Sequence, residues 1–148
     1  MDMRIHNPYN RGTMILSASS VHALRAVAWL AAHENGEAML GRDLARQVNV
    51  PADYLSKVLA TLARGGVLTA SRGVKGGYRL ARPASRIRLI EVVLPFEGKR
   101  AIPGCLLRPG HPCRESGACS AHPAWGRVKD TYTTFLEKTT VAQITGGA

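Results

Sequence analysis

Aromatic residues are scarce in this sequence, at 5% of its 148 residues, while alanine and leucine are plentiful. Apolar residues still reach 45%, which is enough to build a hydrophobic core. This balance indicates a mainly helical fold whose core consists of small aliphatic side chains. The length suits one compact domain with an appendage.

Long apolar runs are also absent, so no segment predicts a membrane span and we expect no membrane partner. Residues 1–13 are polar and do not resemble a secretory signal. We expect them to form a disordered leader, or to lie upstream of a true start for which Met14 is a natural position. The expected compartment is the cytoplasm, where thiols stay reduced.

Acidic residues are missing between Asp53 and Glu91, in a chain whose net charge is +10. A field of one sign this dense usually meets a polyanion. A solvated basic face and an anionic membrane surface are the alternatives. Nucleic acid is favoured, because the same stretch carries a helix-turn-helix pattern and no helix is both basic and strongly apolar on its other face. The basic residues of this stretch are Lys57, Arg64, Arg72, Lys75, Arg79, Arg82, Arg86 and Arg88.

A first helix is expected over residues 17–33, with Ser17 or Ser19 as its N-cap. Met39 and Leu40, which follow it, are expected to be extended.

A helix-turn-helix pattern comes next. Apolar spacing predicts two further helices, over residues 41–47 and 52–64, joined by a turn at residues 48–51. Pro51 fits the first helical position of the second one, where its missing N–H costs nothing. In such a motif the second helix enters the major groove. Its expected exposed positions, which are candidates for contacting bases or phosphates, are Asp53, Tyr54, Ser56, Lys57 and Thr61.

A β-hairpin is predicted directly after this motif, with strands at residues 67–71 and 78–81. We interpret it as the wing of a winged helix; an ordinary solvent-exposed hairpin is the alternative. Another helix is expected over residues 87–97, so that the winged helix-turn-helix domain spans residues 14–98. The wing tip would approach phosphates or the minor groove through its cations and its small residues, namely Arg72, Gly73, Lys75, Gly76 and Gly77.

All three cysteines, Cys105, Cys113 and Cys119, lie with His122 in a proline- and glycine-rich loop expected over residues 99–122. Clustered thiols in a reducing compartment favour a metal over a disulfide. Apart from Cys119 and His122, the intervals are longer than those of structural zinc sites, which favours a wider iron–sulfur cluster. Zinc and thiol switching remain the alternatives. His111 also lies in the loop and is a weaker candidate ligand.

A last helix is predicted from Pro123 to about Lys138. Residues 123–148 are interpreted as a dimerisation helix and tail, because helix-turn-helix proteins usually read two half-sites. Packing of this helix on its own domain is the alternative. The apolar stripe along it consists of Trp125, Val128, Tyr132, Phe135 and Leu136.

Signals of an enzyme are lacking: there is no glycine-rich nucleotide loop before a helix, and there are no paired carboxylates. A cysteine nucleophile with His122 as its base is conceivable, but it would leave the basic helix-turn-helix without a role. We therefore expect a DNA-binding protein rather than an enzyme.

Three motifs together resemble the Rrf2 family of winged-helix regulators, from residue 14 to about residue 144. They are the wing Ser71-Arg-Gly-Val-Lys-Gly-Gly-Tyr-Arg-Leu-Ala81, the segment Val50-Pro-Ala-Asp-Tyr-Leu-Ser-Lys-Val-Leu, and Cys119-Ser-Ala-His122-Pro-Ala-Trp125. The resemblance implies a homodimer that binds a palindromic operator in double-stranded DNA. Several branches of the family carry an iron–sulfur cluster on three cysteines of this loop. Binding of a cluster is expected to order the loop and to shift the recognition helices.

The fourth ligand distinguishes the branches. In regulators of cluster biogenesis a histidine three residues after the third cysteine completes a Cys3His set on a [2Fe–2S] cluster, and His122 stands at that position. In nitric oxide sensors an acidic residue of the partner's first helix serves, and the matching Val21 cannot ligate, although His22 is adjacent. Two features depart from the biogenesis branch. Seven residues separate the first two cysteines, and Ser56-Lys57 replaces Glu-Gln, which predicts a different operator.

Overall fold

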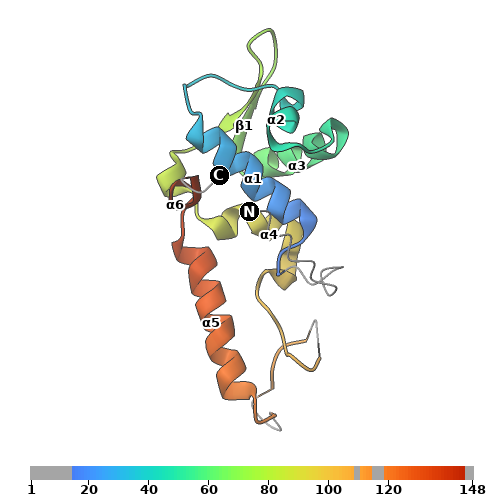
Figure 1. The fold of residues 1–148 in the computed structure, drawn as a ribbon, viewed down its shortest axis with the longest axis vertical. Helices are drawn as coiled ribbons and strands as arrows, with labels where there is room; N and C mark the ends of the chain where they lie inside the picture. Colours follow the sequence, from blue (N-terminus) through green and yellow to red (C-terminus); the bar gives the residue numbers. More distant parts are fainter. Residues whose placement is uncertain (1–14, 109–110, 115–118, 146–148) are drawn as a thin grey trace, which may run out of the picture.

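The computed structural model describes residues 15–108, 111–114 and 119–145, and the expected leader over residues 1–13 lies outside this part. Most of the described chain is helical, and two strands form one antiparallel hairpin (Figure 1). The fold is therefore mainly α with a small β wing, as the sequence predicts. The elements are α1 Ala18–Ala32, α2 Gly41–Val48, α3 Ala52–Arg64, β1 Leu68–Ser71, β2 Gly77–Leu80, η1 Ala84–Arg86, α4 Leu89–Glu97, η2 Gly98–Ala101, α5 His122–Lys138 and α6 Val141–Ile144.

Helix α1 is the central element of the core. Its N-cap is Ser17, one of the two serines that the sequence allowed, whose Oγ accepts a hydrogen bond from the Ser20 N–H at 3.2 Å. The inward face of α1 carries Ala23, Ala26 and Val27, each fully buried. These small side chains let α2, α3, α4 and α6 pack closely around α1.

The turn between α2 and α3 depends on Asn49, which has a φ of 55° and ends α2 in the left-handed region. Pro51 follows as the N-cap of α3, one residue before the first helical position predicted for it. Leu55, Leu59 and Leu62 of α3 are fully buried, so this helix packs firmly on the core with one face. Its other face is left for a partner.

The wing pairs β1 with β2 from Leu68–Leu80 at its base to Ser71–Gly77 near its tip. Met39 adds a short bridge on the outer side of β2, in agreement with its predicted extended conformation. The Met39 N–H donates to the Tyr78 carbonyl at 2.9 Å, and the Tyr78 N–H donates back at 2.7 Å. The wing is therefore held on both edges of β2.

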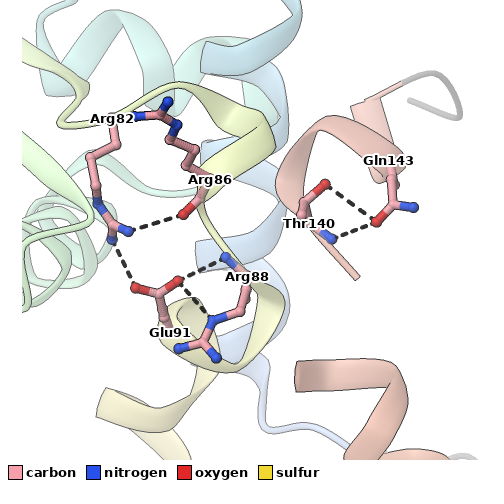
Figure 2. A network of polar contacts seen from close by, with 6 residues as sticks. All are labelled: Arg82, Arg86, Arg88, Glu91, Thr140 and Gln143. Carbon is pink, nitrogen blue, oxygen red and sulfur yellow. Dashed lines mark hydrogen bonds and ion pairs between the residues drawn. The ribbon is translucent and has the colours of Figure 1, made fainter. Parts of the chain in front are cut away.

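The end of the chain returns to the start of α4, as Figure 2 shows. The Leu89 N–H donates to the Thr139 carbonyl at 2.9 Å, and the Val141 N–H donates to the Ile87 carbonyl at 2.8 Å. Gln143 Oε1 accepts from the Thr140 N–H at 2.8 Å and so caps α6. This junction fixes the C-terminal end of α5 against the start of α4.

Helix α5 leads away from that junction and, with the cysteine-bearing segment, forms the end of the molecule opposite the wing (Figure 1). Its predicted apolar stripe is only partly covered. Leu136 is 1% exposed and packs on its own domain, whereas its neighbour Phe135 is 51% exposed and Val128, about two turns earlier, is 54% exposed. Packing on the chain's own domain thus accounts for only part of the stripe. None of the helices in the described part of the chain is long and apolar enough to cross a membrane.

Candidate DNA-binding surface and cysteine site

The exposed face of α3 presents Asp53, Ser56 and Lys57 to solvent. The Ser56 hydroxyl donates to the Asp53 carbonyl at 2.9 Å, and the half-buried Thr61 hydroxyl donates to the Lys57 carbonyl at 3.0 Å. The Ser56 oxygen keeps both lone pairs to accept hydrogen bonds, and Thr61 Oγ1, which already accepts from the Arg64 guanidinium at 3.1 Å, keeps one. The face therefore offers one cation and two short polar side chains at helical spacing, a set suited to phosphates and base edges.

Tyr54 differs from the exposed position that helical spacing predicts. It is half-buried, and its hydroxyl lies 2.7 Å from Ser19 Oγ of α1. The edge of its ring meets His22, also of α1, at a centroid distance of 5.6 Å. Tyr54 thus fastens the recognition helix to α1. A period of 3.6 residues locates a side chain around its own helix, but it does not reveal a neighbour from another helix.

The three glycines of the wing tip differ in the space around their Cβ positions. Gly73 has a φ of +100° and open space around it, so backbone can approach a ligand there. A Cβ on the buried Gly76 would lie 2.6 Å from the Ser71 carbonyl oxygen, and one on Gly77 would lie 2.3 Å from that of Met39. Close approach to DNA was the role predicted for all three glycines. The structure gives Gly76 and Gly77 a different reason to be glycine, the tight packing of the wing on its own chain.

Cations of the basic stretch differ in how far they are engaged within the chain. Glu91 forms ion pairs with Arg82 at 2.9 Å and with Arg88 at 3.4 Å (Figure 2). Burial raises the pKa of the Glu91 carboxyl, but hydrogen bonds from the Arg88 N–H and the Arg82 guanidinium outweigh it, and the net pKa is lowered. These two arginines therefore fasten α4, whereas Lys57, Arg72 and Lys75 are exposed on α3 and the wing.

Cys105 and Cys113 flank one short loop. The pKa of the Cys105 thiol is lowered, first by hydrogen bonding from the backbone N–H groups of Leu107 and Arg108 and less by Cys113 and the Arg108 charge, although partial burial opposes this. The Cys105 N–H donates to the His111 carbonyl at 2.7 Å and closes the loop. Amide N–H groups aimed at a thiolate are a feature of metal–thiolate sites, where they tune the sulfur ligand.

The second pair of candidate ligands, Cys119 and His122, lies at the start of α5. The His122 N–H donates to the Cys119 carbonyl at 3.0 Å. One helical turn later, Trp125 Nε1 donates to the Gly104 carbonyl at 2.8 Å, directly before Cys105. No group of three or more histidine, cysteine or acidic side chains converges within the described ranges. The predicted four ligands are thus placed as two pairs, which the indole bond ties to one another.

Three residues of these sites escaped the sequence analysis. Ser19 and Trp125 carry the hydrogen bonds described above, and Glu97 lies at the junction of α4 with α1. Trp125 stood in the predicted apolar stripe, and its indole N–H, which needs an acceptor when it is buried, was the available signal. Ser19 and Glu97 gave none, because their partners are 35 and 77 residues away.

Comparison with known proteins agrees with the winged-helix fold described above. The family model Rrf2, described as an iron-dependent transcriptional regulator, matches residues 16–147. An HTH-type transcriptional regulator of Mycobacterium tuberculosis, Rv1287, is 31% identical over 91% of this chain and 83% of its own length. The HTH-type transcriptional regulator IscR of Photorhabdus laumondii is 25% identical over 88% of this chain and 79% of its own.

Solved structures show the same fold. CymR, the global cysteine regulator of B. subtilis, has a TM-score of 0.76 at 20% identity, covering 90% of this chain and 97% of its own. IscR of T. potens has a TM-score of 0.69 at 21% identity, covering 89% of this chain and 86% of its own. Relatives are named as transcriptional regulators and not as enzymes. The chain therefore belongs to the Rrf2 family of winged helix-turn-helix transcriptional regulators.

Proposed function

We propose that this regulator is a homodimer that binds a palindromic operator, and that an iron–sulfur cluster on its cysteine loop controls its affinity for DNA. The ligands would be Cys105, Cys113, Cys119 and His122, and the cluster would be [2Fe–2S] rather than [4Fe–4S]. The observation that carries the proposal is the loop between Cys105 and Cys113, which the 2.7 Å hydrogen bond from the Cys105 N–H to the His111 carbonyl closes. The protein would act in the cytoplasm, where its thiols stay reduced.

The donor set fits the chemistry of such a group. Three thiolates and one imidazole are soft to intermediate ligands that suit iron. The Trp125–Gly104 hydrogen bond holds the Cys119–His122 turn next to the Cys105–Cys113 pair. Because no three of these side chains converge within the described residues, the two pairs would need a local rearrangement to close around a cluster. When bound, a cluster of this kind supplies a redox centre that responds to oxidants, nitric oxide or iron shortage.

DNA recognition would use α3 and the wing, within a DNA-binding unit over residues 14–98. Ser56, Lys57 and Thr61 would face the major groove, and Tyr54 would hold the helix that presents them. Arg72 and Lys75 would hold phosphates beside Gly73, where the backbone is open. Gly76 and Gly77 would contribute through the shape of the wing.

Dimerisation would use the exposed part of α5, in a segment over residues 123–148 that follows the cysteine loop at 99–122. Val128 and Phe135 are half exposed on this helix, and Leu107 in the neighbouring loop is 70% exposed. A second copy that covers these side chains would place two recognition helices on one duplex, as a two-fold symmetric operator needs.

A thiol switch is the second candidate, and the proximity of Cys105 and Cys113 favours it. A thiol with a lowered pKa beside a second thiol is suited to reversible disulfide formation, in which an oxidant such as a peroxide accepts the two electrons. A zinc-containing regulator is the third candidate, since the same ligands suit zinc. The composition of the purified protein distinguishes the three.

The test is an absorption spectrum with iron, sulfide and zinc analysis of protein purified without oxygen, compared with Cys113→Ala and Cys119→Ala variants. About two iron and two sulfide per chain in the wild type, lost in both variants together with a change in operator affinity, is the expected result. About four of each would replace the [2Fe–2S] assignment by [4Fe–4S]. A colourless protein that stays colourless after reconstitution would overturn the cluster, and zinc or a reversible Cys105–Cys113 disulfide would then identify the alternative.

A further inference from the structure

Glu97 occupies a junction that the proposed function leaves unexplained. It is the last residue of α4, so it stands directly before the segment that leads to the cysteines. Its Oε1 accepts a hydrogen bond from the Ser20 hydroxyl at 2.5 Å and another from the Ser17 N–H at 2.7 Å. Hydrogen bonds to a charged acceptor are among the stronger ones in proteins.

The two groups that donate to Glu97 belong to the N-cap and the first turn of α1. Ser17 is the N-cap, and Ser20 is the one polar residue that is fully buried in the described part of the chain. The Ser17 hydroxyl also donates to Ser20 Oγ at 3.3 Å. A carboxylate at a helix N-terminus is further stabilised by the helix dipole. The end of α4 and the beginning of α1 are thus joined at a partly buried point.

The same turn of α1 holds the recognition helix. Ser19 lies between Ser17 and Ser20 and forms the 2.7 Å hydrogen bond to the hydroxyl of Tyr54 in α3. His22, one turn further, meets the ring of Tyr54. A shift of this turn therefore moves an anchor of the recognition helix.

The other flank of the cysteine loop reaches this junction as well. Tyr132 of α5 has a buried hydroxyl for which the described residues provide no hydrogen-bond partner. Burial, and then the charge of Glu97, raise the pKa of Tyr132, and α5 packs directly against α4. A buried donor without a partner costs free energy, so a small shift of α5 that gives this hydroxyl an acceptor would be favoured.

We propose that Glu97 is a positioning residue for the recognition helix: it couples both ends of the cysteine loop to Tyr54 through the first turn of α1. In the arrangement described here the carboxylate holds Ser17 and Ser20. A change in the cysteine loop that moves α4 or α5 would alter these two hydrogen bonds. The resulting shift of the first turn of α1 would move Ser19 and, through their hydrogen bond, Tyr54 of α3. The prediction about DNA affinity rests on the proposed function, whereas the predicted effect of Glu97 on the position of α3 does not.

The test uses full-length protein without metal, so that it does not depend on a loaded cluster. Glu97→Ala is compared with Glu97→Gln, which keeps an acceptor oxygen, and with Glu91→Ala, which removes a carboxylate of the same helix that pairs with Arg82 and Arg88. We measure amide hydrogen exchange over α3 and affinity for a duplex selected from a random-sequence pool by the wild-type protein. Glu97→Ala should speed exchange over the first turns of α3 and weaken binding roughly tenfold. Glu97→Gln should recover part of both, and Glu91→Ala should change neither to a comparable extent.

A double-mutant cycle with Tyr54→Phe separates coupling from general destabilisation, because this change removes only the hydroxyl. If Glu97 acts through Tyr54, the double variant should bind little worse than Glu97→Ala alone. Additive losses, or equal effects of Glu97→Ala and Glu91→Ala, would overturn the proposal. A wild-type protein that selects no duplex would refute the proposed function instead, and exchange over α3 would then decide the positioning role alone.

Discussion

At the scale of single residues, the wing depends on a contact that only glycine permits. Gly77 has a φ of +140°, and a Cβ there would lie 2.3 Å from the Met39 carbonyl oxygen. Gly73 also has a positive φ, of +100°, but nothing lies within 4 Å of its Cβ position. Both positions have a backbone conformation that favours glycine, but only a Cβ at Gly77 would collide with another atom. Alanine substitutions at the two positions therefore form a matched pair.

We expect Gly77→Ala to destabilise the protein by about 2–4 kcal/mol, from backbone strain together with the collision. Gly73→Ala should cost roughly 1 kcal/mol, from strain alone. Urea unfolding of both variants measures the difference. Equal losses would show that the backbone between Met39 and Tyr78 yields to the added carbon, and that the close approach is not what requires glycine.

Local chemistry predicted single residues well where the partner is near in sequence. Ser17 as N-cap follows from the few residues around it, and so does the glycine requirement of the wing turn. Tyr54 shows the limit. Its helical position was correct, but its bond to Ser19 joins residues 35 positions apart, and no periodic pattern carries that information.

At the scale of elements, α5 combines an anchored end with an unpartnered one. Leu136 is 1% exposed within the core that includes Val141, whereas Val128, about two turns earlier, is 54% exposed. The helix is therefore held at its C-terminal end, and the exposed part depends on whatever covers it.

We expect Leu136→Ala to destabilise the protein by about 2–5 kcal/mol, because it leaves a cavity in the core. Val128→Ala should change the stability of the isolated chain by no more than about 0.5 kcal/mol. Thermal unfolding over a series of protein concentrations checks both. A loss in Val128→Ala that grows with concentration would indicate that a second copy covers this face, and a small loss in Leu136→Ala would contradict the anchoring of α5.

Element boundaries were predictable to within about two residues for α2, α3 and the wing, because capping residues, proline and glycine mark them in the sequence. The arrangement of the cysteine loop was not. The sequence predicts which residues are suitable ligands, but the pairing of Cys105 with Cys113 follows from loop contacts to Leu107 and His111. The link to Cys119 and His122 follows from one indole hydrogen bond across 21 positions.

At the scale of the whole molecule, the wing and the cysteines lie at opposite ends. The wing and α3 carry the exposed Arg72, Lys75 and Lys57, and the cysteine-bearing segment lies with α5 at the far end (Figure 1). Under the proposed function, a signal received at the cysteines would therefore be carried through packed elements, because the wing at the other end would contact DNA. The junction of Glu97 with α1 lies between the two.

The exposed cations of the wing lead to a quantitative prediction about DNA binding. Phosphate contacts release counterions, so the logarithm of affinity falls with the logarithm of salt concentration by about 0.9 for each phosphate neutralised. Arg72→Ala and Lys75→Ala should each weaken binding to specific and random duplexes alike and flatten this slope by about 1. Lys138→Ala, which removes the same charge from the end of α5, should leave the slope unchanged. Fluorescence anisotropy across a salt series measures all three, and an unchanged slope in both wing variants would show that the wing does not contact the phosphate backbone.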